Sequence, residues 1–174
     1  MYDWLKDEKA PRILVEAVKL LGVVEAPGSV DNPVIMEWAK KVGKSRLGLS
    51  YSADSIPWCG LFIAVCAVNA SLEPPPIAVR ALAWSSWGVP VQRPALGDVL
   101  VFTRKGGGHV GLYVGEDAQA YHVLGGNQGD KVCVTRIAKT RLYSASRTKW
   151  GYKQPENVRL IWLDQSGTLS ENEA

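Results

Sequence analysis

The stretch "SIPWCGLFIAV", residues 55–65, decides the fold because it joins a polar loop to the most apolar segment of the chain. The apolar segment continues to about Leu72, a length that favours a buried helix over a strand. The next residues, "EPPP", end that helix because proline inside a helix removes a hydrogen bond. The sequence therefore predicts a central buried helix that begins beside Cys59.

The elements around this helix change in type along the chain. Residues 11–21 and 33–42 have the apolar spacing of amphipathic helices, and a shorter helix is expected over residues 77–87. After that, short apolar segments separated by Gly, Asp or Asn predict strands at 97–102, 109–115, 119–126, 131–137 and 142–147. Helices followed by antiparallel strands indicate an α+β fold.

The length of 174 residues fits one domain, which we place at residues 1–147. Residues 148–174 form a C-terminal extension, with an edge strand expected over 158–164 and a disordered tail, "QSGTLSENEA", after it. The net charge of +3 is scattered, which excludes the clustered basic face of a nucleic-acid-binding protein. We expect a monomer.

Membrane insertion is not expected. The longest apolar run is well short of the roughly 20 residues that a bilayer requires. The N-terminal "MYDWLKDEKAPR" is acidic as well as basic and lacks the pattern of a signal peptide. We therefore expect synthesis in the cytoplasm, with release or transport by another route if the protein acts outside.

The three cysteines do not form a metal-binding or disulfide framework. Cys59 and Cys66 would lie two helical turns, roughly 10 Å, apart, whereas a disulfide needs Cα atoms within about 7 Å. No Cys-x-x-Cys pair is present, and no oxygen-rich loop indicates calcium. No metal or cofactor is expected.

Cys59 is a candidate nucleophile because the N-terminus of a helix favours an anion and lowers a thiol pKa. A buried structural role is the equal alternative. A thiol nucleophile needs a histidine, and the chain has only His109 and His122. His109 follows "KGGG" at the head of a predicted strand, where the glycines leave the imidazole uncovered, so it is the candidate base.

A third residue should orient the imidazole by accepting its other N–H. Asn127, in "GGNQG", and His122, in "AYHVL", both belong to the next predicted strand or its end. Their separation places them on opposite faces of a regular strand, and a bulge at the glycines between them would change this parity. Asn127 has an alternative role as a turn residue.

Aromatic residues near Cys59 are candidates for substrate binding. Trp58 adjoins the nucleophile and could line a groove, and Trp84 and Trp87 are weaker candidates, with the core as the alternative for all three. Tyr51 and Asp54 precede Cys59 and could complete the site, although roles in the loop and as a helix cap are favoured.

Together these motifs resemble a known family. "PWCGLFIAVC" followed by "GDVLVF", "GGHVGLYVGED" and "VLGGNQGDKV" is similar to the NlpC-type and CHAP-type papain-like cysteine hydrolases of bacterial cell walls, and most to a subgroup common in phages and prophages. The lead-in "DNPVIMEWAKKVG" also resembles that subgroup. The likeness spans residues 11–147.

The resemblance implies a papain-like α+β fold in which the nucleophile helix packs on an antiparallel sheet of about five to six strands. It assigns Cys59 as nucleophile, His109 as base and acid, and Asn127 as orienting residue. Many CHAP members have a glutamate where this chain has Gly125, and many NlpC members use a histidine near the place of His122. This departure leaves the third residue open between Asn127 and His122.

The implied function is a peptidoglycan hydrolase that cleaves an amide, either the muramoyl-L-alanine link or a bond in the stem peptide. A phage or prophage lysin, or a tail-associated enzyme, acting in the periplasm or cell wall, would fit. The alternatives are a non-catalytic cell-wall-binding module on the same fold and an antibacterial toxin amidase.

Overall fold

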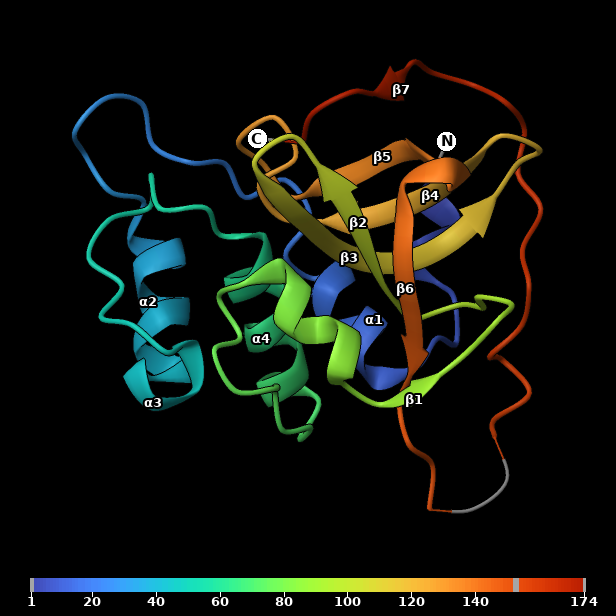
Figure 1. Cartoon of the computed structure of the whole chain (residues 1–174), viewed down its shortest axis with the longest axis horizontal. Coiled ribbons are helices and arrows are strands. Elements are labelled where there is room, and N and C mark those ends of the chain that lie inside the picture. The colour runs from blue at the N-terminus through green and yellow to red at the C-terminus, as the bar shows by residue number, and fades with distance from the viewer. Residues whose placement is uncertain (1, 152–153, 174) are drawn as a thin grey trace.

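A computed structural model describes residues 2–151 and 154–173, and its architecture is α+β (Figure 1). In the described residues one sheet of seven strands has the order β1-β6-β2-β3-β4-β5-β7. Its pairs are antiparallel except β5 with β7. The strands are β1 (Val89–Pro90), β2 (Val99–Arg104), β3 (Gly107–Glu116), β4 (Ala120–Gly125), β5 (Cys133–Ala138), β6 (Leu142–Arg147) and β7 (Leu169–Ser170).

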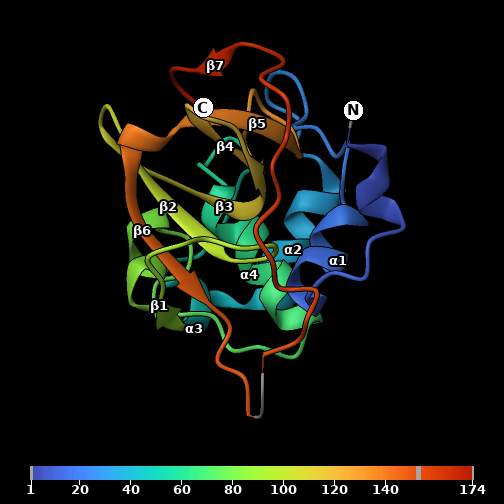
Figure 2. The ribbon, with the colours of Figure 1, turned by 90° about the vertical axis from the view of Figure 1, so that its right-hand side faces the viewer.

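The helices lie together on one side of this sheet (Figures 1 and 2). They are α1 (Arg12–Val18), α2 (Pro33–Val42), α3 (Lys44–Leu47) and α4 (Cys59–Asn69), and 3-10 turns lie at η1 (Asp3–Lys6), η2 (Ala81–Ser86) and η3 (Lys139–Arg141). The α+β class is confirmed. The expected helix over 77–87 is instead the 3-10 turn η2. The two strands beyond the five predicted ones, β1 and β7, are only two residues long each.

Helix α4 is the centre of the core, as its apolar sequence predicts. All its residues from Cys59 to Ala67 are buried, and α1, α2 and β3 pack around it. A helix that is apolar on every side is shielded from water only when neighbouring elements cover its whole surface. Burial of this helix therefore fixes where its N-terminus and Cys59 lie.

Alternation along the strands gives the sheet two apolar faces. Val110, Leu112 and Val114 of β3 join the main core with α4. Tyr113 belongs to a second, smaller cluster on the other face. The full second cluster consists of Leu100, Phe102, Tyr113, Tyr121, Val123, Ile137 and Ala145.

The C-terminal extension packs on the sheet, which corrects two expectations. The expected edge strand over 158–164 is reduced to a bridge between Glu116 and Trp162, and the strand β7 lies further along. The expected disordered tail is attached to the domain: Glu173 is buried and its carboxylate receives two hydrogen bonds of 2.7 Å from Arg141. Residues 152, 153 and 174 of the extension lie outside the described residues.

The described part of the chain contains no helix with the length and apolar character needed to span a bilayer.

A substitution at Gly60 tests the packing of α4. A Cβ at this position would overlap the backbone carbonyl oxygens of Ala78 and Val79, which cannot move like a flexible side chain. We expect Gly60→Ala to lower the free energy of unfolding by about 1–3 kcal/mol or more, measured by urea denaturation. Gly107→Ala is the control, because a Cβ there meets nothing within 4 Å. Equal stability of the two variants would contradict this packing.

Candidate active site

Cys59 lies where the central helix meets the sheet. It is the first residue of α4, so its own backbone N–H and that of Gly60 have no partner within the helix. Both point toward the sulfur, as does the N–H of Val110, the residue after His109. The thiol is therefore held against the head of the strand that carries His109.

Burial dominates the chemistry of this thiol. The side chain is only 4% exposed. Burial raises the pKa of Cys59 above its ordinary value, and the N–H of Val110, the charge of Arg104 and the N–H of Gly60 offset this only in part. The N–H groups at the helix N-terminus lower the thiol pKa, as expected, but desolvation raises it by more. The resting form at neutral pH is the thiol.

His109 lies in β3 and is 1% exposed. Its Nε2 is 3.0 Å from Oε1 of Gln128. The amide nitrogen of Gln128 donates to the carbonyl oxygens of Val123, at 3.2 Å, and Cys133, at 2.5 Å. Because those bonds require the NH₂ group, Oε1 faces His109 and must accept from Nε2–H. This leaves Nδ1 as the unprotonated nitrogen, the tautomer that a general base requires.

Among the described residues, neither sequence candidate for the orienting residue is hydrogen-bonded to His109. Asn127 adopts a left-handed conformation with φ of 55°, which fits its alternative role as a turn residue. His122 is bonded at both nitrogens, Nδ1 to the Tyr2 hydroxyl at 2.6 Å and Nε2 to Asp117 at 2.9 Å. The residue beside His109 is Gln128, one position after Asn127. Sequence reasoning passed over it, although "GGNQG" offers two amides in succession.

Gly125 makes room for this hydrogen bond, and Gly126 makes room for the core beside it. A Cβ on Gly125 would lie 2.7 Å from Oε1 of Gln128 and 3.1 Å from Nε2 of His109. A Cβ on Gly126 would overlap Phe62 and Trp58 of the core. Gly125, the last residue of β4, therefore leaves the space in which Gln128 reaches His109.

The C-terminal extension also contacts the site. Asn172 accepts a hydrogen bond of 3.0 Å from Arg104, and the backbone oxygen of Glu173 accepts one of 3.0 Å from Gly129. Burial lowers the pKa of His109 to about 4, while the negative charge of Glu173 and the hydrogen bond to Gln128 act in the opposite direction. The extension thus belongs to the electrostatic environment of the histidine.

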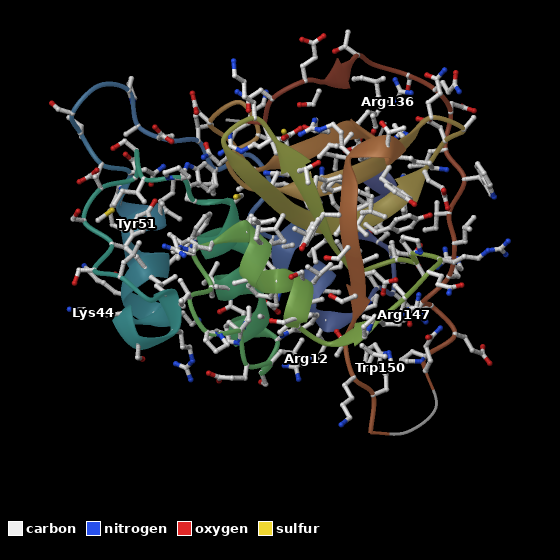
Figure 3. All side chains as sticks on the ribbon, in the orientation of Figure 1. Arg12, Lys44, Tyr51, Arg136, Arg147 and Trp150 are labelled. Atoms are coloured by element: carbon white, nitrogen blue, oxygen red, sulfur yellow. The ribbon has the colours of Figure 1, made fainter. Side chains whose placement is uncertain are left out.

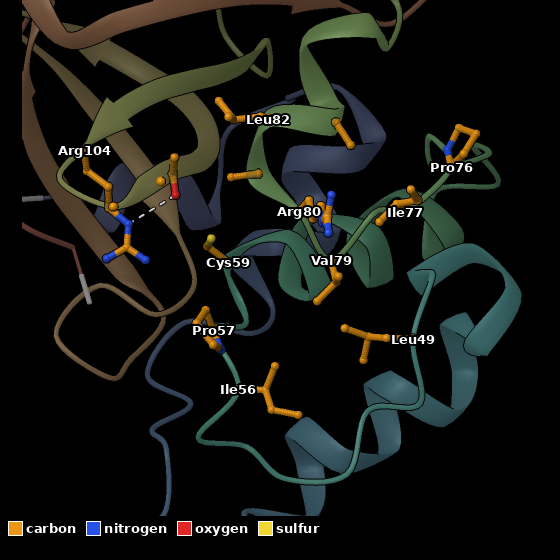
Figure 4. A pocket seen from close by; sticks show the side chains of 15 residues that line it. Leu49, Ile56, Pro57, Cys59, Pro76, Ile77, Val79, Arg80, Leu82 and Arg104 are labelled. Carbon is orange, nitrogen blue, oxygen red and sulfur yellow. Dashed lines mark hydrogen bonds between the residues drawn. The ribbon is translucent and has the colours of Figure 1, made fainter.

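A pocket of about 620 Å³ opens beside Cys59 (Figure 4). Its walls are mainly apolar, and two arginines, Arg80 and Arg104, lie on different sides of Cys59. The guanidinium of Arg80 has no hydrogen-bond or ion-pair partner among residues 2–151 and 154–173. The apolar lining consists of Leu49, Ile56, Pro57, Pro76, Ile77, Val79, Ala81, Leu82 and Ala83. The pocket suits an aliphatic group that also carries an anionic charge.

The structure places Trp58 in the core, which corrects the expectation that it lines a substrate groove. It is 0% exposed, and its indole N–H donates to Glu25 at 2.8 Å. Trp84 is also fully buried and donates to the carbonyl oxygen of Ala78. Trp87 is half-buried and bonded to the carbonyl oxygen of Glu73. The pocket beside Cys59 is therefore lined by aliphatic side chains.

Tyr51 and Asp54 hold the loop before Cys59 in place. The Tyr51 hydroxyl, labelled in Figure 3, donates to the carbonyl oxygen of Ile56 at 2.7 Å. Asp54 accepts from the backbone N–H groups of Ala26 and Asn32. Both residues act as loop braces, the role that the sequence favoured.

Metal binding has no support in the part of the chain that the structure describes. No group of three or more His, Cys, Asp or Glu side chains there is arranged to hold a metal ion.

Comparison with known proteins finds similarity among solved structures only. No protein-family model and no curated protein matches the chain. Among solved structures, the chain is similar to the P60 domain from the M. avium paratuberculosis antigen MAP1272c. The identity is 16%, the alignment covers 85% of this chain and 96% of that chain, and the TM-score is 0.47.

The tautomer and pKa of His109 can be measured directly by nuclear magnetic resonance, since the chain has only two histidines. We expect a neutral Nε2–H ring that titrates at about 4. Glu173→Gln should lower the midpoint further, because a negative charge that stabilises the imidazolium is removed. His122→Gln assigns the two signals. A midpoint near 6.5, the ordinary value, would contradict the buried site.

Proposed function

We propose that the protein is a cysteine hydrolase that cleaves an amide bond of bacterial peptidoglycan. The observation that carries this proposal is the arrangement at the head of β3. The Cys59 thiol contacts the N–H of Val110, and the preceding residue, His109, is fixed by Gln128 in the tautomer of a general base. A nucleophile, a base and an orienting group are the three parts of thiol-dependent acyl transfer.

The reaction begins with proton transfer. Nδ1 of His109 takes the thiol proton as the Cys59 sulfur attacks the amide carbonyl carbon. The backbone N–H of Cys59 donates to the oxyanion that forms. The imidazolium then gives its proton to the leaving nitrogen, the C–N bond breaks, and an acyl thioester remains on Cys59.

Water completes the cycle. His109 removes a proton from a water molecule, whose oxygen attacks the thioester carbonyl. The C–S bond breaks, the proton returns to the sulfur, and the product leaves as a carboxylic acid. Gln128 accepts from Nε2–H throughout and stabilises the transient positive charge on the ring.

The starting state of this reaction is a neutral pair. Burial raises the thiol pKa of Cys59 and lowers the imidazole pKa of His109, so both shifts disfavour a thiolate–imidazolium pair. His109 therefore acts as a base during the attack. Because the neutral ring is the active form, kcat/KM should fall as the pH is lowered through the His109 pKa of about 4.

The pocket beside Cys59 supports a stem peptide as the substrate. Its apolar walls accept small aliphatic side chains such as those of alanine, and Arg80 can pair with a carboxylate of the same peptide. We assign the cleaved bond to the class of stem-peptide or muramoyl-L-alanine amides. The resemblance of the motifs supports a further part of the proposal. The protein acts in the periplasm or cell wall, as a phage or prophage lysin or as a tail-associated enzyme.

A non-catalytic cell-wall-binding module is the second candidate. The observation in its favour is that Cys59 and His109 are both almost fully buried. A binding module would need neither a proton-accepting Nδ1 nor a thiol at the helix start.

Purified sacculi distinguish the two candidates. We expect wild-type protein to release fragments that mass spectrometry identifies as free stem peptides or shortened stems. Cys59→Ala should reduce this release to background, because the nucleophile is lost. Cys59→Ala must retain the wild-type unfolding midpoint for the comparison to hold. Release by both proteins, or by neither, would overturn the proposal.

The orienting role of Gln128 can be separated from the role predicted for Asn127. Gln128→Met keeps the length of the side chain but removes the acceptor for Nε2–H, so we expect a fall in kcat of about 10²-fold with little change in KM. Asn127→Gly keeps the left-handed backbone and should cost far less.

His122→Gln is the third member of that series and should also retain most activity. If kcat falls more in Asn127→Gly or His122→Gln than in Gln128→Met, the orienting residue is Asn127 or His122 and not Gln128. The tautomer of His109 in Gln128→Met supplies a second readout, since loss of the acceptor should relax the preference for Nε2–H.

A further inference from the structure

Trp162 differs from the other tryptophans of the chain. All seven lie among the described residues, and six are buried or half-buried, whereas Trp162 is 65% exposed. Its backbone is held on both sides by the backbone of Glu116. The N–H of Glu116 donates to the carbonyl oxygen of Ile161, and its carbonyl oxygen accepts from the N–H of Leu163, each at 2.8 Å. A large aromatic face is therefore presented to solvent from a fixed position.

This indole forms one wall of a pocket of about 300 Å³. We name it the Trp162 pocket; it is lined by Gln92, Arg93, Pro94, Glu116, Tyr121, Leu160 and Trp162. It combines one exposed ring with an amide, a guanidinium and a carboxylate. Pockets of this kind use the apolar surface for affinity and the few polar groups for orientation.

The charge at the pocket disfavours cationic ligands. Nζ of Lys139 lies 5.3 Å from the ring centroids of both Tyr121 and Trp162 and forms an ion pair with Glu116. The position that a ligand cation would take between the two rings is thus occupied by the chain's own lysine. Arg93 adds a second positive charge. The ligand that fits is neutral or anionic, with one apolar face and several hydrogen-bonding groups.

We propose that the Trp162 pocket binds a saccharide unit of a glycan strand. The C–H bonds on one face of a pyranose pack against the negative face of an indole. Hydroxyl and acetamido groups at the edge of the sugar then bond to Gln92, Arg93 and the Glu116–Lys139 pair. The choice of glycan rests on the proposed function, while the saccharide class rests on the pocket.

The Trp162 pocket is separate from the candidate active site. Glu116 ends β3 and His109 lies near the start of the same strand. Seven residues of extended chain span about 23 Å. A sugar bound at one end of the strand therefore leaves Cys59 and its pocket free for a peptide.

The test uses the full chain with Cys59→Ala, so that no ligand is consumed. The probe is a soluble β-1,4-linked tetramer of N-acetylglucosamine, titrated while the indole N–H signal of Trp162 is followed by nuclear magnetic resonance. We expect a saturable shift confined to residues of the Trp162 pocket. Adding Trp162→Ala should weaken binding at least about ten-fold, because the stacking surface is lost.

Tyr143→Ala is the matched control, since Tyr143 is another aromatic side chain with 60% exposure and lies in β6, outside the pocket. It should leave binding unchanged. Absence of saturable binding, binding that Trp162→Ala does not weaken, or an equal loss in Tyr143→Ala would overturn the proposal. Unchanged circular dichroism confirms that each variant is folded.

The outcome is independent of the hydrolase proposal. Tetramer binding without release of fragments from sacculi by the wild type would overturn the proposed reaction and leave the saccharide site intact. Release of fragments without tetramer binding would overturn the saccharide site alone.

Discussion

The contact between the Cys59 thiol and the backbone N–H of Val110 is the point on which the rest of the structure depends. It joins the first residue of the central helix to the strand that carries His109. Since α4 is apolar on all sides and is covered by α1, α2 and the sheet, its N-terminus has little freedom to move. The position of the nucleophile is therefore set by the core.

Burial that fixes the site also reduces its reactivity at rest. Desolvation raises the pKa of the thiol and lowers that of the imidazole, so it opposes charge on both partners. The backbone N–H groups around Cys59 and the charge of Glu173 near His109 act the other way. These groups stabilise the charges that develop during proton transfer, when a rigid polar site has most effect.

Much of the architecture follows from sequence, because it depends on apolar periodicity. The central helix, the order of elements and the placement of Cys59 at a helix N-terminus could be predicted from residues 55–72. The partner of His109 could not, since the Gln128 side chain reaches the histidine only because Gly125 has no Cβ in its way. Asn127 and Gln128 are adjacent amides; Asn127 has a positive φ, and Gln128 bonds to the histidine.

The structure of the C-terminal extension could not be predicted from apolar periodicity either. Its tail, "QSGTLSENEA", is polar, and composition alone predicts disorder there. Yet Arg141 and Arg104 provide partners for Glu173 and Asn172, so the polar segment is held by specific bonds that periodicity does not reveal. Nothing in the sequence likewise distinguishes Trp162 from the other six tryptophans. The backbone bonds to Glu116 give it a fixed position, so the extension contributes to both ends of β3, with charge near His109 and an aromatic surface beside Glu116.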